Sequence, residues 1–105
     1  MRVFILSCIA AAALWGAPAG SPTAGKEVYD KSCKMCHGAE GQGNPAIAKM
    51  MKVELRHLGS KEVQAKTDEE LKKIITQGSG KMKPITSLSP KQVEDVVAYV
   101  RSLKQ

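Results

Sequence analysis

The run Cys33-Lys-Met-Cys-His37 constrains this chain more than any other feature of its sequence. Two cysteines at this spacing lie one helical turn apart, so both thiols can face the same side of the backbone. The histidine that follows is held where one imidazole nitrogen can reach a metal. This is the pattern through which a c-type haem is attached, with one thioether bond from each cysteine and the imidazole on the iron. We therefore predict one covalently bound haem c, held by Cys33, Cys36 and His37.

Two other uses of a Cys-x-x-Cys pair fit the sequence less well. A thioredoxin-like oxidoreductase needs the pair beside alternating strands and helices, and no segment here has the pattern of a strand. A structural zinc site needs one more ligand close in space, for which His57 is the obvious nitrogen donor. Both interpretations remain weaker than haem attachment.

The start of the chain has the layout of a secretory signal peptide. Met1 and Arg2 form a short basic start, residues 3–14 are largely apolar, and Ala17-Pro18-Ala19 is a small-x-small cleavage pattern. The apolar stretch is short for a membrane span, so an uncleaved anchor is the less favoured interpretation. We expect residues 1–19 to be removed, residues 20–105 to form one haem domain, and the protein to be exported to the periplasm.

The predicted mature segment offers little material for a hydrophobic core. The single Trp and the single Phe both precede residue 20, which leaves Tyr29 and Tyr99 as its aromatic residues. Small domains with thin cores usually depend on disulfides or on a bound metal group. Because both remaining cysteines belong to the haem run, the porphyrin is expected to form the centre of the core.

Cap and turn signals predict an all-α domain of short helices. Helices are predicted over about residues 25–35, 45–51, 68–77 and 90–103. Thr23 can cap the first, a capping box at Thr67 and Glu70 can open the third, and Gly78 can end it. Ser89 can open the last helix in the same way, ahead of its apolar stripe.

An iron bound by His37 needs a second axial ligand or keeps an open position. The candidates in residues 20–105 are the methionines and the second histidine, namely Met35, Met50, Met51, Met82 and His57. Met82 follows a Gly-Ser-Gly-Lys stretch in a loop between two helices, where the backbone can present its thioether to the iron. A thioether is a soft ligand that raises the reduction potential relative to two imidazoles. We predict Met82 as the ligand, with packing roles for Met50 and Met51 and with His57 as the alternative.

The chain resembles the single-haem class I c-type cytochromes, small exported electron carriers of bacteria. The resemblance covers nearly all of residues 20–105. It rests on Gly25 and Tyr29, on Cys33-Lys-Met-Cys-His37, on Gly41-Gln-Gly-Asn-Pro45, on Gly78-Ser-Gly-Lys-Met82 and on the ending from Leu88 to Leu103. It implies short helices wrapped around one haem, with the first and last helices crossing beside it. Gly25 would allow their close approach, and Tyr29 and Tyr99 would pack around the crossing.

The resemblance also implies roles around the haem. The carbonyl of Pro45 would accept a hydrogen bond from the far nitrogen of His37 and so orient the ring. Arg56, His57 or backbone groups would bind the propionates, since no Trp remains in the mature segment. One departure is that Lys83 separates Met82 from the proline that usually follows the ligand directly.

The function that the resemblance implies is electron transfer in a respiratory chain, without enzymatic activity or a small-molecule substrate. A haem-bearing subunit of an oxidase or dehydrogenase complex and a weak haem peroxidase stay open as alternatives. The formal net charge of +6 and the lysines flanking the haem segments predict docking to acidic redox proteins, by a monomer. Nucleic-acid binding is disfavoured because no recognition motif or aromatic platform accompanies the lysines.

Overall fold

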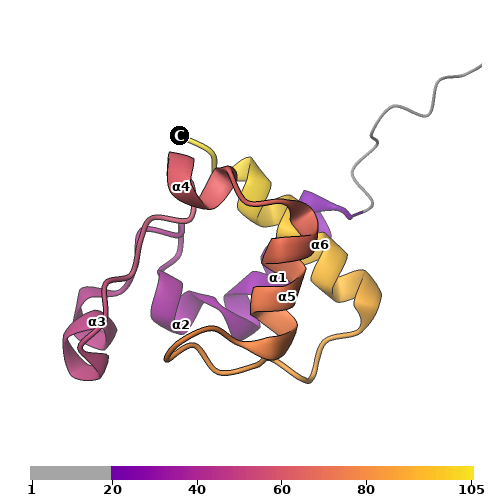
Figure 1. Ribbon diagram of the computed structural model, residues 1–105. Helices are drawn as coiled ribbons and strands as arrows, with labels where there is room; N and C mark the ends of the chain where they lie inside the picture. Colours follow the sequence, from indigo (N-terminus) through magenta and orange to yellow (C-terminus); the bar gives the residue numbers. More distant parts are fainter. Residues whose placement is uncertain (1–19) are drawn as a thin grey trace, which may run out of the picture.

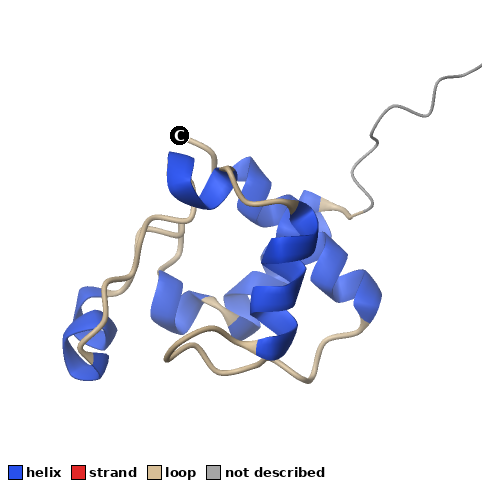
Figure 2. Cartoon of the chain, in the orientation of Figure 1, coloured by secondary structure: helices blue, strands red, loops and turns tan. Residues whose placement is uncertain are grey.

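The structure, a computed structural model, describes residues 20–105, so the predicted signal peptide lies outside the described residues. The helices are α1 (Pro22–Ser32), α2 (Lys34–His37), α3 (Pro45–Met51), α4 (Lys61–Gln64), α5 (Asp68–Gln77) and α6 (Pro90–Ser102). Residues 20–105 contain no strand, only one isolated bridge between Ser79 and Met82. The prediction of an all-α fold is confirmed (Figures 1 and 2). No helix in this part of the chain is long and apolar enough to cross a membrane.

The core forms where α1 crosses α6. A Cβ atom on Gly25 would lie 1.8 Å from the carbonyl oxygen of Asp95 and 3.0 Å from the Cβ of Tyr99, so glycine is what lets the two backbones approach. Tyr29 is fully buried at the crossing, and its ring centroid lies 4.9 Å from that of Tyr99 at an interplanar angle of 56°. The crossing that the family resemblance implies is therefore present.

Helix α5 covers the same core from the side. Its buried residues Leu71 and Ile75 join one hydrophobic cluster with Val96, Val97 and Val100 of α6. The apolar stripe predicted for the last helix is thus the face that α6 buries. In Figure 1, α5 lies in front of α1 and beside α6.

The ends of the helices agree with the cap signals in most places. The capping boxes at Thr67 and Ser89 are both formed, and Gly78 ends α5 with a φ of 78°. The first helix begins earlier than predicted: Ser21, not Thr23, is its N-cap, because Pro22 at the first position is preset for the helix. The chain leaves α-geometry at Cys33, which divides the predicted helix into α1 and α2.

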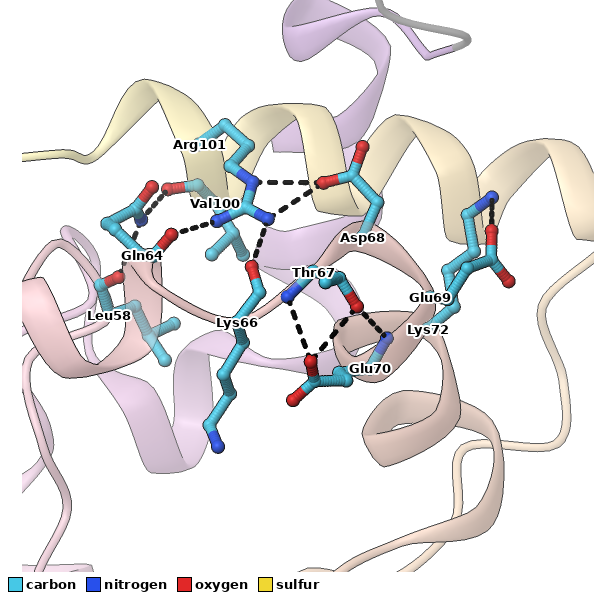
Figure 3. Close-up of polar contacts among 10 residues, drawn as sticks. All are labelled: Leu58, Gln64, Lys66, Thr67, Asp68, Glu69, Glu70, Lys72, Val100 and Arg101. Atoms are coloured by element: carbon cyan, nitrogen blue, oxygen red, sulfur yellow. Dashed lines mark hydrogen bonds and ion pairs between the residues drawn. The ribbon is translucent and has the colours of Figure 1, made fainter.

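Helix α4 was not predicted, because a single turn has no periodic pattern to detect. Gln64, its last residue, and Arg101 of α6 join this turn to the rest of the domain (Figure 3). The Arg101 guanidinium donates to a carboxylate oxygen of Asp68 from Nε at 3.0 Å and from Nη2 at 2.9 Å, and to the Gln64 carbonyl at 2.9 Å. The Gln64 amide donates to the carbonyls of Leu58 at 2.8 Å and Val100 at 3.0 Å. These bonds fix the start of α5 on α6.

Candidate haem-binding site

One cavity brings the predicted haem residues together. It has a volume of about 650 Å³, and Cys33, Cys36, His37 and Met82 all line it. Its walls come from α2, from α3 with the segment after it, and from the loop after α5. Apolar side chains that complete these walls are Ile47, Met50, Met51, Val53, Leu55 and Ile85. A largely apolar cavity of this size with few polar groups is typical of a cofactor site.

The two cysteines stand at either end of the single turn that forms α2. His37 N donates to the Cys33 carbonyl at 3.0 Å, which closes this turn and sets both side chains at the cavity. Both thiols are free and half-buried. Burial, with a smaller contribution from the neighbouring Cys36, raises the pKa of Cys33 to about 11, so this thiol is protonated at neutral pH.

The imidazole of His37 is in the protonation state that binds a metal. Burial lowers its pKa, because the protein interior disfavours the charged form, so the ring is neutral at pH 7. A neutral imidazole is the form that coordinates a metal. Its Nδ1 atom is buried and has no hydrogen-bond partner among the described residues. Such orphaned polar atoms are uncommon in folded proteins.

The structure corrects one expectation about His37. The hydrogen bond from its far nitrogen to the Pro45 carbonyl is not formed, since Nδ1 has no partner. Pro45 is the first residue of α3, and a helix directs the carbonyl of its first residue along its own axis, toward the amide four residues later. Pro45 is exposed and does not line the cavity. Its observed role is to start α3, whose side chains do line it.

Asn44, which was not predicted as a site residue, links α2 to α3. Its side-chain oxygen caps α3 by accepting from Ala46 N at 3.0 Å, and its side-chain nitrogen donates to the Met35 carbonyl at 3.0 Å. Its backbone amide donates to the Cys36 carbonyl at 2.8 Å, and Gly43 N donates to the His37 carbonyl at 2.6 Å. An asparagine directly before a proline is a common start of a helix, and this was the signal that could have identified it.

The two tyrosines of the core also reach the haem run. The Tyr29 hydroxyl donates to the Gly38 carbonyl at 2.5 Å, directly after His37, and the Tyr99 hydroxyl donates to the Ala39 carbonyl at 3.4 Å. The crossing of α1 and α6 therefore holds the segment that follows His37.

Met82 lies in a tight turn of the loop after α5. Ser79 N donates to the Met82 carbonyl at 3.0 Å, and Met82 N donates to the Ser79 carbonyl at 2.9 Å. Gly78 allows the turn, because its φ is positive and a Cβ there would lie 2.5 Å from the Met82 carbonyl oxygen. The loop location predicted for Met82 is thus observed, and its side chain lines the cavity.

The other candidate ligands lie as follows. Met50 and Met51 line the cavity, in agreement with packing roles, whereas His57 does not. His57 Nδ1 accepts from Gly59 N at 2.9 Å, and its Nε2 lies 3.3 Å from the side-chain nitrogen of Gln105. This engagement leaves the bis-histidine alternative without support.

The donors and walls of this cavity fit a covalently bound haem. Two free thiols one turn apart, a neutral imidazole and a thioether are present together. Thiols, imidazole and thioether are the groups that attach and ligate haem c. Residues 20–105 contain no cluster of three or more His, Cys, Asp or Glu residues that could hold a metal ion by themselves.

Comparisons with known proteins agree with this chemistry. The sequence model of the cytochrome c family matches residues 22–104. Cytochrome c-554(547) of Halothiobacillus neapolitanus is 33% identical over 91 residues, which cover 82% of this chain and 100% of that protein.

Solved structures show the same similarity. The KustC0563 c-type cytochrome has a TM-score of 0.68 and 30% identity, over 77% of this chain and 98% of its own. Cytochrome cL from Hyphomicrobium denitrificans has a TM-score of 0.64 and 26% identity, over 85% of this chain and 51% of its own. A chain of the Kuenenia stuttgartiensis reducing HAO-like protein complex has a TM-score of 0.66 and 28% identity, over 83% of this chain and 44% of its own.

Proposed function

The chain belongs to the cytochrome c family and carries one covalently bound haem c, and on this premise we propose that it shuttles single electrons between exported or membrane-bound redox proteins. Haem-based electron transfer is the activity of the family. When bound, the haem supplies an iron whose oxidation state changes by one electron. The remaining task of the protein is to hold this group, to set its potential and to let partners approach.

The observation that carries the proposal is that four residues with the required chemistry line one cavity. Cys33 and Cys36 would hold the haem through thioether bonds, and His37 and Met82 would hold its iron as axial ligands. The thioether of Met82 favours the ferrous state and raises the potential. With the haem bound, the apolar walls would limit water around the iron, which would further disfavour the more charged ferric state.

The composition of the cavity favours a carrier over an enzyme. A peroxidase needs acid–base groups beside an accessible position on the iron. Glu54 is the single carboxylate among the described residues that line the cavity, and the thioether of Met82 would occupy the second ligand position on the iron. The proposed ligation leaves no position where a substrate would bind.

Lysines lie on the elements that form the walls of this cavity, and two of them, Lys81 and Lys83, line it. These lysines are Lys34 in α2, Lys49 in α3, Lys52 at the end of α3, and Lys81 and Lys83 in the loop that holds Met82. A positive field around the haem steers encounter with an acidic surface and raises the association rate. We therefore propose acidic redox proteins as the partners of a monomeric carrier.

Cytochromes c of this family are typically exported. We propose that residues 1–19 act as a signal peptide that is removed after Ala19, and that residues 20–105 work in the periplasm. The match of the family to residues 22–104 supports this division.

The ligand assignment is tested by comparing Met82→Ala with Met50→Ala, since both remove a thioether from the same cavity. In Met82→Ala, Cys33 and Cys36 keep the haem attached, but the near-infrared band of thioether ligation should disappear. The midpoint potential should fall by on the order of 0.1 V or more, within the range of about 0.8 V that axial ligands span. Met50→Ala should keep the band and change the potential little.

These changes are measured by a redox titration followed by visible and near-infrared absorption. If the band survived in Met82→Ala, Met82 would not be the axial ligand. Loss of the band in Met50→Ala instead would assign the ligand to α3.

A further inference from the structure

The turn that holds Met82 makes a polar contact across the mouth of the cavity. Lys81 Nζ donates to the Met51 carbonyl at 2.6 Å, although the two residues are 30 positions apart in the chain. Met51 is the last residue of α3, and both Met51 and Lys81 line the cavity. In Figure 1, the tip of the loop after α5 points toward α3. The contact therefore joins the two walls between which the haem would lie.

The chemistry of this contact is favourable at both ends. The last carbonyls of a helix lack partners within the helix and carry a partial negative charge. An ammonium group is a suitable donor for them, and hydrogen bonds to charged groups are stronger than neutral ones. Lys81 is exposed, so water competes with the bond and reduces its contribution.

The other hydrogen bonds of this loop lead elsewhere. Ser79 and Met82 bond to each other, Gly78 N donates to the Ile74 carbonyl at 2.9 Å, and Ile85 N donates to the Ile75 carbonyl at 2.9 Å. All of these connect the loop to itself or to α5. Among the described residues, Lys81 supplies the one hydrogen bond from the loop to α3. Without it, the turn could swing away from α3 while keeping its own shape.

We propose that Lys81 is a positioning residue: a strap that holds the Met82 turn closed against α3 and thereby limits replacement of Met82 by small external ligands. This inference rests on the proposed role of Met82 as axial ligand. It assigns to Lys81 a role apart from the general attraction of acidic partners, which the other lysines of the mouth share.

Lys83 provides a matched control. It lies in the same loop, lines the same cavity and carries the same charge, but the described residues give it no hydrogen bond or ion pair. Lys81→Ala and Lys83→Ala therefore change the charge of the cavity mouth equally, while Lys81→Ala alone removes the strap. Lys81→Arg keeps a cationic donor at the position.

The experiment measures imidazole binding to the ferric protein by stopped-flow absorption. We expect Lys81→Ala to bind imidazole about 3- to 10-fold faster, the effect of losing one partly exposed charge-assisted hydrogen bond. Lys81→Arg and Lys83→Ala should stay within about twofold of the unmodified protein, because neither loses the bond to Met51. Hydrogen exchange followed by mass spectrometry should show faster exchange of the amides of residues 79–82 in Lys81→Ala only.

Equal acceleration in Lys81→Ala and Lys83→Ala would attribute the effect to charge and overturn the strap. Unchanged binding and unchanged exchange in Lys81→Ala would overturn it as well. Met82→Ala separates this failure from failure of the proposed ligation. If Met82→Ala binds imidazole fast while Lys81→Ala does not, only the strap is wrong. If Met82→Ala binds imidazole no faster than the unmodified protein does, the ligand assignment and the strap are both wrong.

Discussion

Replacing Gly25 with alanine tests the packing on which the haem side of this protein depends. The new Cβ would lie 1.8 Å from the Asp95 carbonyl oxygen, and this contact must lengthen to about 3.4 Å to become an ordinary van der Waals contact. The helix backbone fixes the position of the new Cβ, and the Asp95 carbonyl is also helix backbone, so no side-chain rotation relieves the overlap. The two helices must separate around Tyr29, which is fully buried between them.

The magnitude follows from two opposing effects. Alanine stabilises a helix interior by about 1 kcal/mol relative to glycine. Overpacking of a close contact typically costs 1–3 kcal/mol, and a backbone contact places the cost at the upper end, about 3 kcal/mol. The net loss in the free energy of unfolding is about 2 kcal/mol, which lowers Tm by roughly 8–16 °C in a domain of this size.

The assay is thermal unfolding of the haem-loaded protein, followed by circular dichroism. Glu27→Ala is the control, because it places the same side chain on an exposed position of α1 and should change stability by less than about 0.5 kcal/mol. A Gly25→Ala protein that is more stable than the unmodified one would show the helix propensity of alanine unopposed. That result would refute the close approach of α1 and α6.

Three further predictions concern charge, the α2–α3 link and acid stability. Electron transfer to an acidic partner should slow as the salt concentration rises, because the screening length falls from about 30 Å at 0.01 M to about 10 Å at 0.1 M. In stopped-flow measurements at low salt, Lys83→Glu should slow electron transfer further. A rate independent of salt would contradict electrostatic steering. Asn44→Ser keeps a cap for α3 but loses the hydrogen bond to the Met35 carbonyl, so denaturant unfolding should show a free energy of unfolding about 1 kcal/mol lower. Asn44→Ala loses both the cap and this bond, and the decrease should be about 2 kcal/mol. An Asn44→Ser protein of unchanged stability would show that the bond to Met35 contributes nothing. Lys91 and the amide of Ser21 hold the pKa of the buried Asp95 below 3.8, so its carboxylate stabilises the fold above that pH and the contribution is lost as pH falls through the lower folded pKa. The difference in Tm between Asp95→Asn and the unmodified protein should therefore be full at pH 7 and shrink as the pH falls below 3.8 toward the lower folded pKa, and a constant difference would count against this assignment.

Features that depend on neighbouring residues could be predicted from the sequence. The capping box of α5 needs only Thr67 and Glu70, three positions apart, and that of α6 needs Ser89 and Gln92. The turn before Met82 depends on Gly78, whose positive φ most other residues adopt only with strain. In each case the atoms that decide the structure lie within one turn of each other, so the spacing of the residue types carries the information.

Features that depend on how separate elements meet could not be predicted in the same way. The expected bond between His37 and Pro45 required a particular orientation of α3 relative to α2, and Asn44 sets a different one. The engagement of His57 with Gly59 and Gln105 depends on where the C-terminal residues pack. Neither the residue types nor their spacing contain these orientations.

The same distinction explains why the loop position of Met82 could be predicted and the closure of the site could not. A loop methionine after a Gly-Ser-Gly-Lys stretch is a local pattern, and Met82 lies at the cavity as that pattern indicates. The opposite wall is α3, which Asn44 ties to α2. How tightly the two walls close thus depends on long-range contacts, and the bond from Lys81 to Met51 is the polar contact between them among the described residues. On the proposed role of Lys81, two proteins with the same haem run and the same ligand would differ in access to the iron through one surface lysine.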